Sequence, residues 1–136
     1  MSLRIEKSCS NALDLAGFLQ HHQRVLSVNY PGLPESEFHE IASTQFAERY
    51  GGILTFDLES REACFALLDN LHLIKRATNV NDNKTLILHP ASTIFCEYPD
   101  EVLHDIGVRQ TMIRLSAGIE DFDDLRNDLA MGLASL

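Results

Sequence analysis

The apolar pattern of the chain predicts one domain of mixed helices and strands. Its 136 residues are enough for a single core but few for two. Segments with helical and strand periodicity follow one another in the order helix, strand, helix, strand, helix, strand, strand, helix, strand, helix. Two architectures fit this order. One is an α+β domain, with helices on one face of a mainly antiparallel sheet of about four or five strands. The other is a small doubly wound parallel sheet.

The first part of the chain contains two predicted helices and a strand. Residues 4–20 carry a broad apolar stripe at helical spacing, and residues 25–29 form a short strand that ends at a Pro-Gly turn. Pro34 suits the first position of a second helix, since acidic residues follow it in the first turn. The side chains expected to face inward from this helix are Phe38, Ile41, Ala42 and Phe46.

The middle of the chain alternates again between strand and helix. Residues 53–58 have apolar and polar side chains in turn, which predicts a half-buried strand. Ser60 can cap the next helix. The inward residues of that helix are expected to be Cys64, Leu67, Leu68 and Leu71. Residues 73–78 form a further strand, and the turn-forming residues 79–83 form a polar loop.

The last third contains two strands and two helices. Residues 85–89 form a strand closed by a proline, and residues 99–106 form a short helix followed by a glycine. Residues 112–116 form a strand, and Asp121, with Asp124 three residues on, begins the final helix. The side chains that this helix is expected to bury are Phe122, Leu125, Leu129 and Leu133.

Arg114 is the unusual residue of the strand 112–116, because it places a guanidinium in an otherwise apolar segment. Such a group is costly to bury unless an anion satisfies its donors. One interpretation is an internal salt bridge with one of the twenty acidic residues. The other is a planar fork that binds the carboxylate of a small ligand through two hydrogen bonds.

Composition excludes several classes of partner. The formal net charge of −9 argues against nucleic acid or an anionic membrane as a partner. Cys9, Cys64 and Cys96 lack metal or disulfide spacing and indicate a reducing compartment. No stretch is apolar enough to span a bilayer, and the first residues do not resemble a signal peptide. A cytoplasmic location is therefore expected.

Other chemistry-bearing residues have simpler interpretations. Lys75 and Lys84 could form a Schiff base only in a dry pocket that lowers the pKa of the lysine, and both are expected to be solvated. The six histidines lack the spacing of metal ligands. There is no phosphate-binding glycine loop and no nucleophile elbow.

Four ordered motifs resemble one family. They are Asn11-Ala12-Leu13 with residues 28–33, Gly51-Gly52-Ile53-Leu54-Thr55-Phe56, residues 84–93, and Arg-Leu-Ser-x-Gly-Ile-Glu-Asp at 114–121. Together they resemble the C-terminal part of the Cys/Met-metabolism enzymes that use pyridoxal phosphate (PLP). This family includes cystathionine γ-synthase, cystathionine γ-lyase, methionine γ-lyase and O-acetylhomoserine sulfhydrylase.

The resemblance favours the α+β architecture, because the family's small domain has helices on one face of a mainly antiparallel sheet. It implies that residues 1–136 are that C-terminal domain and that the PLP-binding domain, with its Schiff-base lysine, precedes it. Arg114 matches the arginine that binds the substrate α-carboxylate, and Asn79 falls where other branches carry a serine beside that carboxylate. No catalytic, cofactor-binding or metal-binding residue is expected within this chain.

Two differences from the family's motifs bear on which branch of the family the chain resembles. The turn after Asn79 reads Asn81-Asp82-Asn83 rather than containing a glycine, and Thr93-Ile94-Phe95 stands where many members have Thr-Thr-His. Residues 79–85 are most similar to those of the O-acetylhomoserine sulfhydrylases. The implied parent enzyme is a PLP-dependent transferase or lyase of trans-sulfuration or methionine biosynthesis, of the O-acetylhomoserine sulfhydrylase or cystathionine γ-synthase type.

The resemblance also sets expectations for the isolated chain. The isolated chain should be inactive and should not bind PLP. The parent enzyme is expected to be a homo-oligomer. An apolar patch around Leu13 or Phe18 should favour a weak dimer. Two rival interpretations remain: a stand-alone α+β regulatory module that binds an amino acid, and a purely structural or dimerising domain with Arg114 in an internal salt bridge.

Overall fold

The computed structural model describes residues 2–136 and contains one five-stranded sheet. The strands lie in the order β1-β2-β5-β4-β3, and every neighbouring pair is antiparallel except β3 and β4. Their bounds are Ser27–Asn29 (β1), Ile53–Asp57 (β2), Lys75–Arg76 (β3), Leu86–Leu88 (β4) and Met112–Ser116 (β5). The α+β prediction, with a mainly antiparallel sheet, is confirmed.

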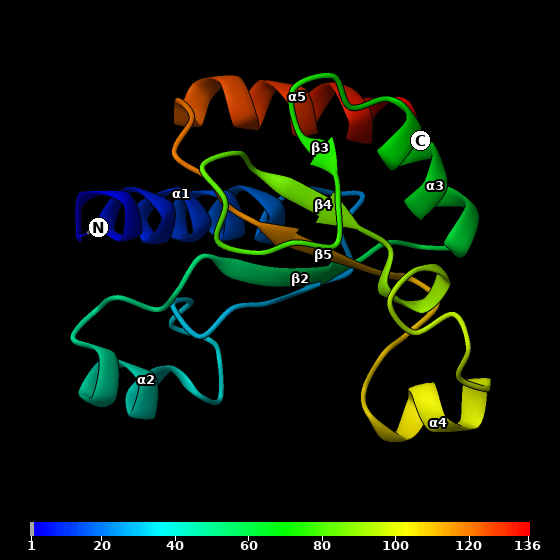
Figure 1. Cartoon of the computed structure of the whole chain (residues 1–136), viewed down its shortest axis with the longest axis horizontal. Helices are drawn as coiled ribbons and strands as arrows, with labels where there is room; N and C mark the ends of the chain where they lie inside the picture. Colours follow the sequence, from blue (N-terminus) through cyan, green and yellow to red (C-terminus); the bar gives the residue numbers. More distant parts are fainter. Residues whose placement is uncertain (1) are drawn as a thin grey trace.

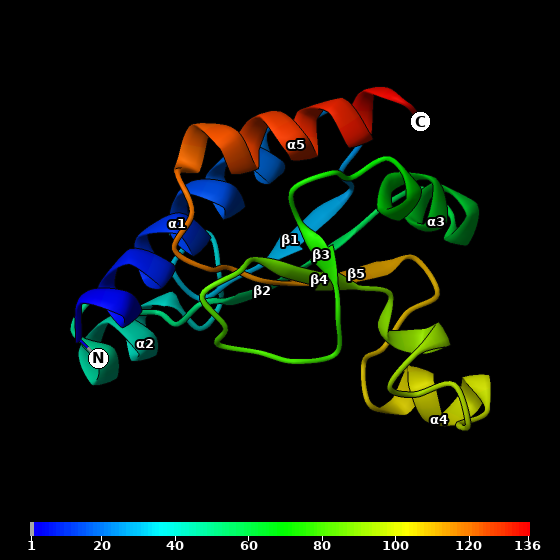
Figure 2. The same ribbon diagram turned by 45° about the horizontal axis from the view of Figure 1, so that its top comes forward.

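Three helices form a layer on one face of this sheet (Figures 1 and 2). They are α1 (Ser2–Gln20), α3 (Arg61–Asp69) and α5 (Phe122–Ala134). The two short helices, α2 (His39–Phe46) and α4 (Asp100–Asp105), lie away from this layer at opposite ends of the molecule. A 3₁₀ turn, Pro90–Ser92, follows β4. The other face of the sheet, which we call the open face, carries no helix across β2 and β5.

Alternation along the two central strands places the core between sheet and helices. Leu54 pairs in register with Leu115, and Phe56 pairs with Ile113. All four are almost completely buried together with apolar residues of α1, α3 and α5. Burying such a side chain contributes about 1.5–3 kcal/mol, so this layer is the main source of stability.

The turn between β5 and α5 is tied to the first helix by polar contacts. Ser8 Oγ donates to the carbonyl of Ala117 at 2.7 Å, and Asn11 Nδ2 donates to the carbonyls of Gly118 and Glu120 at 3.1 and 2.9 Å. Because carbonyls in a buried turn need partners, these side chains replace the solvent that they would otherwise require.

The same turn also holds the start of β4. The Glu120 carboxylate accepts hydrogen bonds from the amide and hydroxyl of Thr85 at 2.6 and 2.8 Å. A Cβ at Gly118 would collide with the carbonyl oxygen of Asn83, so this close approach requires glycine. The Ser-x-Gly-Ile-Glu sequence is therefore a junction between β5, β4 and α1.

Helix caps agree with the sequence. Ser60 Oγ accepts from the amide of Ala63 at 3.0 Å, and the Asp121 carboxylate accepts from the amide of Asp123 at 2.9 Å. Each cap satisfies an amide that the helix itself leaves without a partner.

The strand predicted at 73–78 is shorter than expected. It is limited to Lys75–Arg76, because the preceding amides bind a side chain instead of a neighbouring strand. The buried carboxylate of Asp128 accepts from the amides of His72, Leu73 and Ile74 at 2.9–3.0 Å. This carboxylate fixes the end of α3 against α5.

The prediction for the second helix was wrong in two respects. The helix begins at His39 rather than Pro34, because the preceding residues form successive turns. Only Ala42 of its expected apolar stripe is buried, and the exposed members are Phe38, Ile41 and Phe46. Contacts with Tyr50 hold the helix instead: His39 stacks on the Tyr50 ring, and Ser43 Oγ lies 2.9 Å from the Tyr50 hydroxyl.

The expected apolar patch on the first helix is small. Leu13 is exposed, but Phe18 packs partly against the core. Weak self-association therefore stays a prediction, to be tested by light scattering of the isolated chain across a range of concentrations.

Candidate functional site

The open face of the sheet carries the polar residues of the two central strands. Thr55 and Asp57 of β2 point away from the helical layer, because Leu54 and Phe56 point into it. On β5 the corresponding positions are Arg114 and Ser116. Arg114 lies directly opposite Thr55 in the antiparallel register.

Arg114 makes no ion pair with the residues that the structure describes. Its Nη2 donates to the carbonyl oxygens of Thr78 at 2.9 Å and Asn79 at 3.3 Å. Its Nε is buried and has no hydrogen-bond partner within residues 2–136. Burial without a compensating anion lowers the pKa of Arg114. The internal salt bridge is thus not present, and the guanidinium keeps donors available for an external anion.

Asn79 lies beside Arg114, and its contact with the guanidinium is through the backbone. The Asn79 side chain is exposed, and the residue's carbonyl oxygen meets the guanidinium. The loop between β3 and β4 crosses the open face (Figure 2), and the amide of Asn81 donates to Ser116 Oγ at 3.1 Å. This bond fixes the loop to β5 and so fixes the carbonyls that orient Arg114.

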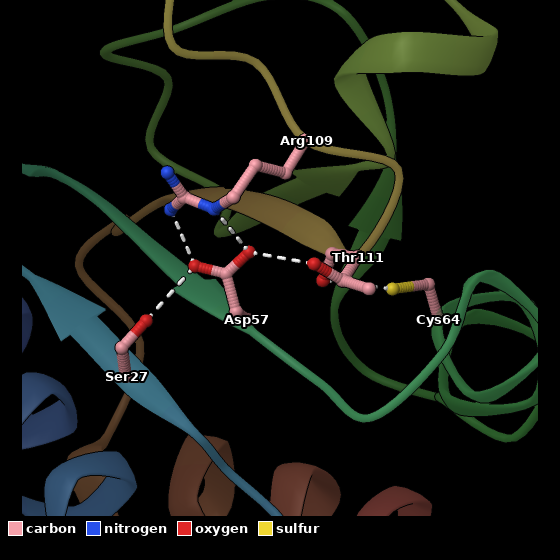
Figure 3. A network of polar contacts seen from close by, with 5 residues as sticks. All are labelled: Ser27, Asp57, Cys64, Arg109 and Thr111. Atoms are coloured by element: carbon pink, nitrogen blue, oxygen red, sulfur yellow. Dashed lines mark hydrogen bonds and ion pairs between the residues drawn. The ribbon is translucent and has the colours of Figure 1, made fainter. Parts of the chain in front are cut away.

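A second arginine near this face, Arg109, is paired with a carboxylate of the chain, in contrast to Arg114 (Figure 3). Arg109, just before β5, donates through Nε at 2.8 Å and through Nη2 to the buried carboxylate of Asp57. Ser27 and Thr111 hydroxyls also donate to Asp57, each at 2.9 Å. Cys64 Sγ extends the network by donating to the carbonyl of Thr111 at 3.1 Å. Every oxygen of this carboxylate is therefore satisfied.

The two arginines differ in their electrostatics accordingly. Burial alone would raise the pKa of Asp57, but the hydrogen bonds from Arg109, Ser27 and Thr111 outweigh it and lower that pKa. The hydrogen bond to Asp57 raises the pKa of Arg109. Arg109 thus has the pairing of a structural cation, whereas Arg114 has no counterion among residues 2–136.

Sequence reasoning missed the pair of Asp57 and Arg109. The available signal was an acidic residue at a half-buried position of a strand, because such a carboxylate requires a partner. Nothing in the local sequence indicated which arginine would supply it.

The remaining candidates are accounted for by local structure. All three lysines, Lys7, Lys75 and Lys84, are exposed. His89 is buried, with Nε2 2.8 Å from the carbonyl oxygen of Gln110 and Nδ1 2.8 Å from Ser92 Oγ. Within residues 2–136 there is no cluster of metal-ligating side chains, and no helix among them is long and apolar enough to cross a membrane.

Comparison with known proteins identifies the family. The family model described as Cys/Met metabolism PLP-dependent enzyme matches residues 1–134. The chain belongs to this family. O-acetyl-L-homoserine sulfhydrylase 1 of Thermus thermophilus is 40% identical over 98% of the chain, which covers 32% of that relative.

Solved structures agree with the sequence match. A Campylobacter jejuni protein described as an O-acetylhomoserine (thiol)-lyase, crystallised with N'-pyridoxyl-lysine-5'-monophosphate, has a TM-score of 0.94 and 36% identity. The chain itself is matched over 98% of its length and covers 32% of that protein. Cystathionine γ-lyase of Lactobacillus plantarum, complexed with L-serine, has a TM-score of 0.90 and 29% identity, with 98% of this chain and 35% of that chain covered. The chain thus spans about a third of the length of these relatives, which are PLP-dependent transferases and lyases.

The described residues do not fit the lysine-linked cofactor of this family. A lysine that carries PLP must sit in a desolvated pocket, whereas the lysines here are all exposed. No step of PLP chemistry can therefore be assigned to the side chains of this chain.

Proposed function

We propose that this chain is the C-terminal, substrate-orienting domain of a PLP-dependent enzyme that acts at the γ-carbon of an activated homoserine or a sulfur amino acid. Its task in that enzyme is to bind the α-carboxylate of the substrate through Arg114. The observation that carries this proposal is the partly buried guanidinium that has backbone carbonyls, but no carboxylate, as partners. The names of the relatives, which are enzymes of homoserine and sulfur amino-acid metabolism, support the substrate class.

The geometry suits a carboxylate for a physical reason. The carbonyls of Thr78 and Asn79 engage Nη2 and restrict rotation of the guanidinium, so little freedom is lost when a ligand binds. Arg114 also lacks a competing anion within the described part of the chain, so its full charge is available. A guanidinium offers two parallel donors to a carboxylate, which fixes the orientation of the ligand as well as its position.

Asn79 contributes to the same site in this proposal. Its carbonyl oxygen contacts Arg114 and its side chain is exposed, so its amide N–H is free to donate to a carboxylate oxygen. Holding the substrate at two points orients its α-hydrogen toward the catalytic base, which we assign to a part of the enzyme outside this chain. Orientation of this kind can lower a barrier by several kcal/mol.

Substitution in the full enzyme tests the proposal. Arg114→Ala should reduce kcat/KM by at least about 100-fold, because a hydrogen bond to a charged group contributes about 1.5–3 kcal/mol and two are lost. Arg114→Lys should recover little, because a point charge does not replace the fork. Arg126→Ala, which removes a half-exposed arginine paired with Asp123 on α5, is the matched control and should have little effect.

A substrate analogue that lacks the α-carboxylate separates recognition from folding. The unmodified enzyme and Arg114→Ala should process it equally poorly. If Arg114→Ala retained full activity on the intact substrate, Arg114 would not be the carboxylate-binding residue. If the chain were instead a stand-alone regulatory module, the isolated chain would bind amino acids, and calorimetry would detect this binding.

A further inference from the structure

Two buried polar atoms on the open face lie opposite each other without partners. Four buried side-chain atoms in the described chain lack a hydrogen bond: Asn11 Oδ1, Gln110 Oε1, Thr55 Oγ1 and Arg114 Nε. Asn11 and Gln110 are anchored through their amide nitrogens. Thr55 has no other side-chain polar atom, so its hydroxyl is entirely unused. Its register partner across the two strands is Arg114.

The other polar side chains of β2 and β5 on this face are already engaged. Asp57 accepts from Arg109, Ser27 and Thr111, and Ser116 accepts from the amide of Asn81. Thr55 and Arg114 are thus the pair that remains. Directly opposite residues in an antiparallel pair have their Cβ atoms about 4.5–5.5 Å apart, within reach of a long side chain.

Folding alone does not explain a threonine at this position. Valine has the same shape and the same preference for strands, and it would bury no unpaired hydroxyl. A buried hydroxyl without a partner lowers stability, so its presence indicates that it forms a hydrogen bond in another state of the protein.

We infer that Thr55 is a positioning residue for Arg114, and this inference rests on the carboxylate-binding role proposed above. When the substrate carboxylate engages the guanidinium, Thr55 Oγ1 accepts the hydrogen bond of Arg114 Nε. The guanidinium is then held on one side by Thr55 and on another by the carbonyls of Thr78 and Asn79. Both hydrogens of Nη2 are used by those carbonyls, so the two hydrogens of Nη1 are left for the carboxylate.

A double-mutant cycle in the full enzyme tests this role. Thr55→Val should raise KM about tenfold, as expected for one hydrogen bond to a charged group, with a smaller change in kcat. Thr55→Ser retains the hydroxyl and should restore most of the loss. In the Arg114→Ala background, Thr55→Val should have no further effect, because Thr55 acts only through Arg114. Thr44→Val, which removes an exposed hydroxyl of α2, is the matched control.

Stability distinguishes this role from a structural one. Thr55→Val should leave the unfolding midpoint unchanged or raise it. Equal losses of activity in both backgrounds, or a lowered unfolding midpoint, would overturn the inference. If Arg114→Ala raises KM but Thr55→Val does not, only the role of Thr55 fails. If Arg114→Ala leaves KM unchanged, the carboxylate-binding proposal fails and the role of Thr55 fails with it.

Discussion

Removing Arg109 should lower the stability of the chain much more than removing Arg114. Arg109→Ala leaves the Asp57 carboxylate buried with only the two hydroxyl donors of Ser27 and Thr111. Loss of one partner of a fully buried pair costs about 3–5 kcal/mol. Since the Arg109 side chain is 52% exposed, and since the hydroxyls remain, we expect a loss of about 2 kcal/mol.

Arg114→Ala should change the free energy of unfolding by no more than about 1 kcal/mol. The substitution removes exposed hydrogen bonds to the carbonyls of Thr78 and Asn79, each worth about 0.5–1.5 kcal/mol. It also removes the buried, unpaired Nε, whose desolvation costs about 1–3 kcal/mol. These two effects oppose each other and nearly cancel.

Urea unfolding of the isolated chain, followed by circular dichroism, measures both values. With a slope of about 1–3 kcal/mol per molar urea, Arg109→Ala should lower the midpoint by roughly 1 M, while Arg114→Ala should leave it nearly unchanged. If Arg114→Ala instead destabilised the chain as much as Arg109→Ala, Arg114 would be a structural cation and the reasoning would be refuted.

Three further predictions concern buried groups. Asp128→Ala should destabilise the chain by about 3 kcal/mol in the same assay, because three consecutive amides lose their acceptor; a loss below about 1 kcal/mol would mean that water replaces the carboxylate. The lowered pKa of Asp57 makes its stabilisation complete above its unfolded value of about 3.9 and lost as the pH falls through the folded pKa. The stability advantage of the unmodified chain over Asp57→Asn should therefore be full at pH 6 and shrink below about pH 4; an advantage independent of pH would contradict it. Finally, a thiol reagent at pH 8 should modify Cys96 rapidly and leave Cys64 protected until unfolding, because burial raises the pKa of Cys64 to about 12. If Cys64→Ala had one rapidly reacting thiol fewer than the unmodified chain, Cys64 would be accessible in the folded state and the prediction would be wrong.

The sequence predicts those elements whose local residue pattern directly reflects which side chains the fold buries or which caps it uses. β2 and β5 alternate because one face meets the helical layer, and Ser60 begins α3 because capping is a local interaction. Arg114 was identifiable because a lone cation in an apolar strand requires a reason.

Elements that depend on distant partners were not predictable in the same way. The apolar stripe of α2 is exposed because the described chain offers no surface that covers it. The strand around Lys75 is short because Asp128, more than fifty residues later, binds the preceding amides. Arg109 and Asp57 are 52 residues apart in sequence, so only the folded chain shows that they pair.

The junction between α1 and the turn after β5 has a consequence for synthesis of the protein. Ser8 leaves the ribosome 109 residues before Ala117, its hydrogen-bond partner. At about 5–20 residues per second, the delay is roughly 5–20 s. Throughout that interval the apolar stripe of α1 lacks α5, the helix that later packs against it. The nascent chain must therefore keep its first helix from aggregating until nearly all of the domain has been made.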